Sequence, residues 1–218
     1  MKTIQIPTTS NPFIVSINNH VYTYRAGSTV EVPDEVAAAI EDALELVPKP
    51  KRNPSQIAQI ANGTITEITA SDLEGIGTIA YYAFYSCPSL ARIEIPDSVT
   101  SIGEGAFYNC KSLTSVVIPH SVKTIGTNAF TACKLLKTVR FGEDSSLESI
   151  GSDAFQWCSV LERVYLPDAP PTLANVGAFQ NINKDCVFYC KTQASLEAYK
   201  AVANWSTLTG TYTFVVEA

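Results

Sequence analysis

Hydrophobic residues recur at fixed intervals along most of the chain. Two consecutive segments show this best: SLARIEIPDSVTSIGEGAFYNCK at residues 89–111 and SLTSVVIPHSVKTIGTNAFTACK at residues 112–134. Ile, Gly, Ala, Phe and Cys keep their places in both, whereas most of the residues between them change. One such segment cannot bury its own apolar side, so neighbouring copies must stack against it. The pattern predicts a solenoid whose constant residues line the interior.

Three less regular copies flank this pair. Residues 65–88 form an atypical first copy, residues 135–159 form a copy that is two residues longer, and residues 160–184 form a copy without the cysteine. The sequence therefore predicts a mainly β fold, a solenoid of about five turns with parallel strands and roughly 23 residues in each turn.

Each copy contains a short alternating run that predicts a β-strand. In residues 92–95, Ile93 and Ile95 should point inward while Arg92 and Glu94 point outward, because successive strand side chains alternate between faces. A proline or glycine should then turn the chain; these residues are Pro96, Pro119, Gly142 and Pro167. Further along, glycine is expected to serve a tight bend in three copies; these residues are Gly103, Gly126 and Gly151.

Stacking of the copies places equivalent residues on top of one another. Parallel strands lie about 4.8 Å apart, so each constant position should form a column. The expected aromatic column consists of Phe84, Phe107, Phe130, Phe155 and Phe179. The expected aliphatic ladder consists of Ile93, Val116, Val139 and Val164.

The first part of the chain lacks the repeat and predicts a small module at residues 1–47. Asn18-Asn19 suits a turn between strands at Phe13–Ile17 and 21–24, and a third strand is expected at 28–32. The segment PDEVAAAIEDALELV, at residues 33–47, predicts a helix with one apolar stripe.

The rest of the chain divides into a linker, the solenoid and a cap. Residues 48–62 read as a Pro- and Lys-rich linker. The solenoid is expected at residues 63–184. A C-terminal cap of helix and strand is expected at residues 185–218.

Composition and charge narrow the function classes. The chain is 46% hydrophobic and 17% charged, which is enough apolar material for a sizeable core. A net charge of −6 disfavours nucleic acid as a partner, because phosphate binding needs a basic stripe. No long apolar run predicts membrane insertion, and the N-terminus MKTIQIPTTSNPF has no apolar core of a secretory signal.

The residues that could carry chemistry favour a protein without catalysis. Four cysteines share one repeat position and are expected to form a ladder of buried free thiols: Cys87, Cys110, Cys133 and Cys158. Cys186 and Cys190 flank one expected strand, about 13 Å apart, so they should not bond. Two histidines, His20 and His120, allow no Ser-His-Asp arrangement. We therefore expect no catalytic residue, no metal site and no cofactor.

The repeat L-x-x-I-x-I-P-x-x-V-x-x-I-G-x-x-A-F-x-x-C resembles the BspA-like leucine-rich repeat family. Residues 113–133 carry it most cleanly, and the resemblance covers residues 65–218. The tail SLEAYKAVANW at residues 195–205 is similar to the family's C-terminal cap, although VFYCK at residues 187–191 replaces the usual strand followed by proline. Members are mostly surface-exposed adhesion or binding proteins, so the resemblance implies a recognition surface rather than a chemistry.

The N-terminal module resembles those of phage and prophage head-fibre or tail-associated proteins. The segments that carry this likeness are NPF at residues 11–13, YTYRAG at residues 22–27 and VPDEV at residues 32–36. It implies a non-enzymatic virion protein that is anchored to a capsid or tail protein through this module, and it predicts a symmetric homo-oligomer. A bacterial cell-surface adhesin or a secreted binding protein remains the alternative.

The outward strand positions form the candidate ligand-binding face. One row should contain Arg92, Ser115, Thr138, Arg163 and Val187, and the next Glu94, Val117, Arg140, Tyr165 and Tyr189. Arg and Tyr often carry binding energy at interfaces, and the partner would be a host surface protein or a glycan. The candidate residues are Arg92, Glu94, Arg140, Arg163, Tyr165 and Tyr189. The alternative is that these are ordinary strand residues with high β-propensity.

Overall fold

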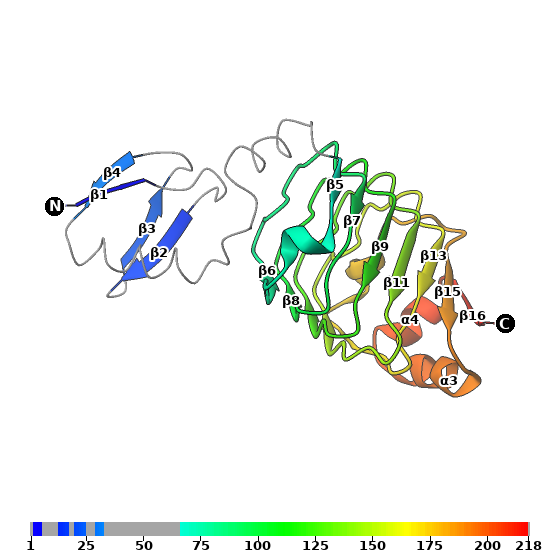
Figure 1. Cartoon of the computed structure of the whole chain (residues 1–218). Coiled ribbons are helices and arrows are strands. Elements are labelled where there is room, and N and C mark those ends of the chain that lie inside the picture. The colour runs from blue at the N-terminus through cyan, green and yellow to red at the C-terminus, as the bar shows by residue number, and fades with distance from the viewer. Residues whose placement is uncertain (1, 6–12, 18–19, 25–28, 33–65, 218) are drawn as a thin grey trace.

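The computed structural model describes residues 2–5, 13–17, 20–24, 29–32 and 66–217 (Figure 1). Near the N-terminus, β1 (Lys2–Gln5) pairs with β4 (Thr29–Val32), and β2 (Phe13–Ile17) pairs with β3 (His20–Tyr24), both antiparallel. The predicted hairpin and third strand are confirmed, and β1 is an additional strand that the pattern did not indicate. The helix expected at 33–47 and the linker at 48–62 lie outside the described residues.

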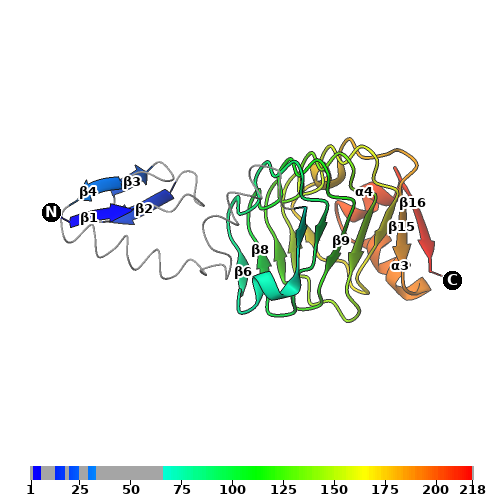
Figure 2. The same ribbon diagram turned by 45° about the horizontal axis from the view of Figure 1, so that its top comes forward.

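Residues 66–217 form a succession of short strands that stack into a solenoid, with successive turns side by side (Figure 2). The long-strand sheet runs in the order β9 (Ser115–Ile118), β11 (Thr138–Phe141), β13 (Arg163–Tyr165), β15 (Val187–Cys190) and β16 (Thr213–Val216). The short-strand sheet contains β6 (Thr78–Ile79), β8 (Ser101–Ile102), β10 (Thr124–Ile125), β12 (Ser149–Ile150) and β14 (Thr172–Leu173). All pairs in both sheets are parallel, as predicted.

A third, separate pair of strands begins the solenoid. β5 (Glu67–Ile68) pairs with β7 (Arg92–Ile93), and β7 is not part of the long-strand sheet. The Thr114 amide still donates to the Ala91 carbonyl at 3.3 Å, so the chain follows the same path. Strand pairing joins Val116, Val139 and Val164 of the predicted aliphatic ladder, whereas Ile93 lies on β7, which pairs with β5 and not with β9.

The aromatic column is confirmed along its whole length. Successive rings from Phe84 to Phe179 stack with centroids 5.0 to 5.2 Å apart and planes within 10°. Phe107, Phe130 and Phe155 are completely buried. These stacked rings fill the centre of the coil, where close packing decides stability.

The repeated glycines begin a turn and also allow close approach between neighbouring coils. The Ala129 amide donates to the Gly126 carbonyl at 3.3 Å, so the predicted bend does begin at this glycine. The left-handed residue of that turn is Asn128, with φ 58°. A Cβ atom on Gly126 would lie 2.5 Å from the Glu104 nitrogen, and one on Gly151 would lie 2.5 Å from the Thr127 nitrogen, so the neighbouring backbone also excludes a side chain.

The cysteine ladder is confirmed. All six cysteines are buried and free. The Cys110 thiol donates to the Phe84 carbonyl at 3.1 Å, and Cys133 and Cys158 repeat this contact one and two turns further along at 3.3 and 3.2 Å. Burial raises the pKa of the Cys110 thiol to about 12, so this thiol acts as a neutral donor in the core.

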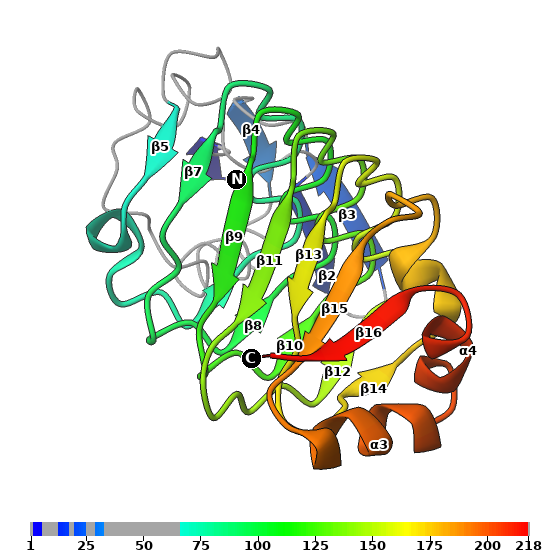
Figure 3. The same ribbon diagram turned by 90° about the vertical axis from the view of Figure 1, so that its right-hand side faces the viewer.

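The C-terminal cap closes the open end of the core, as predicted. It contains α3 (Gln193–Ala201), α4 (Trp205–Thr209) and β16, which lie together beyond β15 (Figure 3). Trp205 is completely buried, and its Nε1 donates to the Pro171 carbonyl at 2.7 Å. The Tyr199 hydroxyl donates to the Pro167 carbonyl at 3.0 Å. These bonds satisfy polar atoms that would otherwise be buried without partners.

Two short 3-10 helices complete the described elements: η1 (Ala70–Leu73) after β5, and η2 (Val176–Phe179) in the last repeat. None of the helices in the described part of the chain has the length and apolar character of a membrane span.

Candidate functional site

The outward positions of the long-strand sheet lie in two rows. Strand register aligns Ser115, Thr138, Arg163, Val187 and Thr213 in one row, and Val117, Arg140, Tyr165, Tyr189 and Val215 in the other. The predicted order of these rows is correct from β9 to β15, and β16 extends each row by one residue. The alternating burial of β9 and β11 shows that these side chains point away from the core.

A cation and two aromatic rings stack along the second row. The Arg140 guanidinium carbon lies 3.5 Å from the Tyr165 ring centroid. On the next strand, the Tyr189 ring stacks on Tyr165 with centroids 4.7 Å apart and an interplanar angle of 16°. Because the strands lie in the order β11, β13, β15, Tyr165 is held between the other two side chains. We call Arg140, Tyr165 and Tyr189 the Arg–Tyr stack.

The stack limits what Tyr165 can offer to a ligand. One face of its ring meets Arg140 and the other meets Tyr189, so neither face is open. The ring presents its edge and its hydroxyl group instead. Stacking of a sugar on Tyr165, which needs a free face, does not fit this geometry.

The Arg140 side chain is fixed from a second direction. Its Nη1 lies 3.7 Å from Oε1 of Glu217, a residue that follows β16. Both side chains are about half exposed, so the ion pair itself contributes little to stability. Its effect is to orient the guanidinium, whose N–H groups form a planar set of donors.

Arg163 and Val117 extend the surface around the stack. Arg163 lies in the first row, and its Nη2 is 3.8 Å from a Glu162 oxygen. Val117 is 55% exposed and is the register partner of Arg140. Together with the stack they give this end of the sheet a mixed apolar and charged surface.

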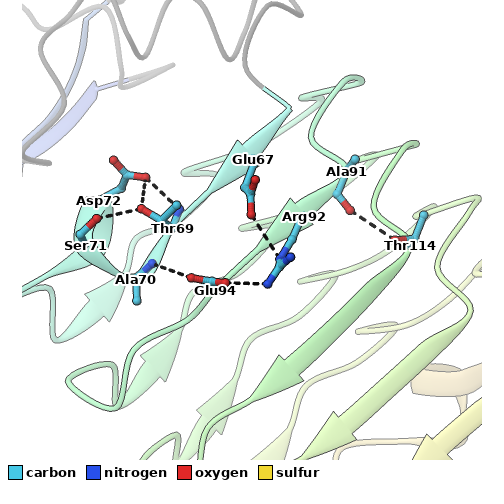
Figure 4. A network of polar contacts seen from close by, with 9 residues as sticks. All are labelled: Glu67, Thr69, Ala70, Ser71, Asp72, Ala91, Arg92, Glu94 and Thr114. Atoms are coloured by element: carbon cyan, nitrogen blue, oxygen red, sulfur yellow. Dashed lines mark hydrogen bonds and ion pairs between the residues drawn. The ribbon is translucent and has the colours of Figure 1, made fainter.

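Arg92 and Glu94 lie apart from the other four candidate residues, on the β5–β7 pair (Figure 4). The Arg92 guanidinium contacts Glu67 at 3.2 Å and Glu94 at 2.7 Å. Glu94 also accepts a hydrogen bond from the Ala70 amide at 3.4 Å. The structure thus brings Arg140, Arg163, Tyr165 and Tyr189 together and engages the other two in a local network.

The same network fixes the start of η1. Thr69 and Asp72 form a reciprocal cap in which the Thr69 amide and hydroxyl both donate to Asp72 Oδ2, at 2.8 and 2.7 Å. Further along, the Thr114 hydroxyl donates to the Ala91 carbonyl (Figure 4). These contacts order the first turns of the solenoid and have a structural role.

A half-open hollow of about 80 Å³ lies at the end of the Arg–Tyr stack. Its lining comes from the ends of β11 and β13, from the turns that follow them, and from the residues directly after β15 and β16. The lining residues with charged or aromatic groups are Arg140, Phe141, Glu143, Asp144, Tyr165, Asp168, Lys191 and Glu217. Four carboxylates and two cations make its charge negative. The sequence patterns did not indicate this hollow.

One irregularity in the sequence does coincide with the hollow. Glu143 and Asp144 belong to GEDSS at residues 142–146, within the copy that is two residues longer. Insertions in a solenoid form loops, often on the binding face. Lys191 pairs with Asp168 at 3.5 Å, whereas no ion pair within residues 66–217 engages Glu143 or Asp144. These two carboxylates are available to an incoming group.

The face has no metal site in the part of the chain that the structure describes. No group of three or more His, Cys, Asp or Glu side chains there could hold a metal ion. His120 lies beside Asp97, with Nδ1 3.5 Å from Oδ1, and both are exposed. What the surface offers is a set of positioned contacts.

Comparison with known proteins identifies the repeat. The model of the BspA type leucine rich repeat region matches residues 77–205 in six copies. A search of curated proteins found no match.

Solved structures of repeat proteins are also similar. A leucine-rich repeat protein from Bacteroides ovatus ATCC 8483 shares 36% identity over 48% of this chain and 26% of its own, with a TM-score of 0.44. The T. pallidum leucine rich repeat protein shares 28% identity over 56% and 72%, with a TM-score of 0.41. A leucine rich cell surface protein from Faecalibacterium prausnitzii A2-165 shares 19% identity over 65% and 64%, with a TM-score of 0.23. This chain therefore spans about a quarter of the Bacteroides ovatus protein.

Proposed function

The chain belongs to the BspA-type leucine-rich repeat family, and from that membership we propose that it is a non-enzymatic binding protein whose long-strand sheet recognises a protein partner. The observation that carries the proposal is the Arg–Tyr stack, with Tyr165 held between Arg140 and Tyr189. The stack lies beside the hollow. In the neighbouring row of the same sheet, the outward side chains other than Arg163 are small or aliphatic.

Preorganisation is the physical reason that the stack suits recognition. Tyr and Arg are enriched among the residues that dominate binding energy. Here the two rings and the guanidinium already hold one another in place, so a partner orders fewer side chains when it binds. The cost in conformational entropy falls accordingly.

The exposed groups fit a protein better than a sugar. Val117 offers apolar contact, Arg140 and Arg163 offer N–H donors, and the hollow offers carboxylates to a basic side chain. Both faces of the Tyr165 ring are covered, which removes the contact that a sugar ring would use. A partner with mixed polar and apolar side chains meets all of these groups.

For location, we propose the bacterial cell surface or the exterior, in keeping with the adhesion role that the family resemblance implies. A virion role rests on the likeness of the N-terminal module alone, and the family match begins at residue 77. The two differ in assembly: a virion anchor predicts a symmetric homo-oligomer, whereas a surface adhesin predicts a monomer. Light scattering on the full chain distinguishes them.

The proposal is tested by binding of the full chain to immobilised collagen, laminin and fibronectin in surface plasmon resonance. The Arg163→Ala/Tyr165→Ala variant should lose at least about ten-fold in affinity for the protein that binds, since one interface anchor is worth about 1.4 kcal/mol or more. The matched control is Lys134→Ala/Trp157→Ala, which removes an exposed cation and ring outside the sheet. Equal loss in both variants, or no binding of the wild type, contradicts the proposal.

A further inference from the structure

The first repeat carries tyrosines where later repeats carry small or polar residues. Tyr81 and Tyr82 occupy the positions of Glu104 and Gly105 in the next repeat. The backbone confirms this alignment, because the Tyr82 amide donates to the Glu104 carbonyl at 2.9 Å. We call Tyr81, Tyr82, Tyr85 and Tyr108 the tyrosine cluster.

The four rings form a continuous arrangement. The Tyr81 and Tyr82 centroids are 4.1 Å apart with planes at 88°, and the Tyr82 and Tyr85 centroids are 5.0 Å apart with planes at 76°. Tyr85 and Tyr108 stack, 5.2 Å apart with planes at 13°. The cluster thus combines a pair of stacked rings, Tyr85 and Tyr108, with the Tyr82 ring at a steep angle to Tyr85.

Gly105 fixes the cluster on the solenoid. A Cβ atom there would lie 2.3 Å from Cε1 of Tyr82, so the absence of a side chain gives the Tyr82 ring its place. Tyr82 itself has a left-handed backbone with φ 51°, which is costly for an aromatic residue. The fold holds this ring in position against local backbone preference.

The outer rings remain accessible. Tyr81 is 55% exposed and Tyr85 is 50% exposed. Tyr85 stacks on Tyr108 on one side, and no second ring within residues 66–217 stacks parallel to it on the other. Tyr165 differs in this respect, since Arg140 and Tyr189 cover both of its faces.

Polar residues adjoin the cluster along the chain and in the next repeat. Asn109 donates from Nδ2 to the Ser86 hydroxyl at 3.0 Å, one residue beyond Tyr85 and Tyr108. Glu104 follows Tyr81 one repeat along the solenoid. Within residues 66–111, the large apolar side chains that are exposed are Tyr81 and Tyr85, with no aliphatic one among them.

We propose that the tyrosine cluster is a carbohydrate-binding site for β-linked chains of gluco-configured pyranose units. Such units carry their hydroxyl groups around the ring edge, which leaves C–H bonds on both flat faces. The negative face of an aromatic ring attracts these C–H groups. The phenol, amide and carboxylate groups at the edge of the cluster can bond the equatorial hydroxyl groups.

An apolar protein surface fits the cluster less well. Its exposed apolar groups are all flat and all carry a hydroxyl group, whereas protein interfaces also draw on aliphatic side chains in a desolvated centre. The site is also distinct from the Arg–Tyr stack, because its turns follow β6 and β8 of the short-strand sheet in the first two repeats. Failure of either proposal leaves the other standing.

The test is electrophoresis of the full chain in native gels that contain hydroxyethylcellulose or glycol chitin. The wild type should be retarded by both polymers and not by dextran, whose units are α-linked. The Tyr81→Ala/Tyr85→Ala variant should lose about ten-fold or more in apparent association constant, while Tyr81→Phe/Tyr85→Phe keeps most of the retardation because its ring faces remain. Trp157→Ala, which removes an exposed aromatic ring elsewhere, should migrate as the wild type.

Three results overturn the proposal. They are unchanged wild-type mobility in both β-linked polymers, equal retardation in dextran, and full retardation of the Tyr81→Ala/Tyr85→Ala variant. Thermal unfolding of each variant accompanies the gels. If the Ala variant is unfolded, Tyr81→Ser alone gives the same comparison, since Tyr81 is the most exposed ring of the cluster.

Discussion

The Arg140 guanidinium carbon lies 3.5 Å from the centroid of the Tyr165 ring, and the two residues are direct register partners on β11 and β13. The contact is therefore built into the repeat register and does not depend on a flexible loop. It forms on the exposed side of the sheet, whereas the Phe column lies in the buried core, on the segments that follow β8, β10 and β12. The two stacks therefore differ in how much they contribute to the stability of the fold.

Removal of the exposed stack should leave the fold nearly intact. Tyr165→Ala is expected to lower the free energy of unfolding by only about 0.5–1.5 kcal/mol, because it loses a partly exposed cation–π and stacking contact. Phe130→Ala, in the completely buried column, should cost about 3–5 kcal/mol. Urea denaturation of the two variants measures the difference, and equal losses would show that the exposed stack is structural.

The glycines of the repeat should respond to substitution according to the neighbouring backbone. In Gly126→Ala the new Cβ would meet the Glu104 nitrogen at 2.5 Å, so we expect a loss of about 1–3 kcal/mol or more from overpacking. Gly77→Ala is the matched control, since nothing lies within 4 Å of its Cβ position. There the smaller entropy of the unfolded chain should give a gain of up to about 1 kcal/mol. Equal melting temperatures for the two variants would refute close approach as the reason for the glycines.

One left-handed position offers a stabilising substitution. Ala132 has φ 61°, a conformation that costs a residue with a Cβ about 1–2 kcal/mol. Asn109 and Asn181 occupy the equivalent position in other repeats with φ 61° and 59°. Ala132→Asn should therefore raise stability by about 0.5–1 kcal/mol, because asparagine tolerates this region. Lys111→Asn, at an exposed position with an ordinary backbone, should change stability by less than about 0.5 kcal/mol. Thermal unfolding that ranks the two variants in the opposite order contradicts the argument.

The buried thiols make stability depend on alkaline pH. Desolvation raises the pKa of Cys110 from 9.0 to about 12 and that of Cys87 to about 11, so the folded state keeps these protons longer than the unfolded state. Their contribution is complete below pH 9 and is lost as the pH rises toward 12. Over this window one thiol changes the free energy of unfolding by up to about 1.4 kcal/mol for each pH unit.

Comparison with a variant isolates this effect from that of other groups. Cys110→Ala should give a shallower decline in the free energy of unfolding between pH 9 and 10.5 than the wild type, although its stability at pH 7 is lower. Urea denaturation at several pH values measures both slopes. Parallel declines would mean that the Cys110 thiol is not shielded from water.

The buried side of the fold follows closely from the sequence, because the same pattern of apolar residues occurs in several copies. The positions of Phe107, Val139 and Cys133 could be predicted from spacing alone, since each lies at a constant place in a stacked unit. The sequence predicts a bend at Gly126 but not the close approach of the neighbouring turn, because that approach is visible only in three dimensions.

The outward side follows less completely. Alternation predicted that Arg140, Tyr165 and Tyr189 share a row, but not that Tyr165 is covered on both faces. Arg92 lies outside that group because β7 pairs with β5 and not with the long-strand sheet, and its guanidinium pairs with Glu67 of β5. A sequence signal for the tyrosine cluster does exist in AYYAFY at residues 80–85. There, Tyr81 and Tyr82 stand where the next copy has Glu104 and Gly105.

If the Arg–Tyr stack binds a protein partner as proposed, its side chains become covered in the complex. Hydroxyl-radical footprinting reports directly which side chains are covered. It is done on the full chain alone and on its complex with whichever of collagen, laminin and fibronectin it binds. We predict that Tyr165, Tyr189 and Val117 are protected from oxidation in the complex, while Trp157 and Tyr81 react as in the free chain. Unchanged oxidation of Tyr165 and Tyr189, with protection elsewhere, would contradict the account.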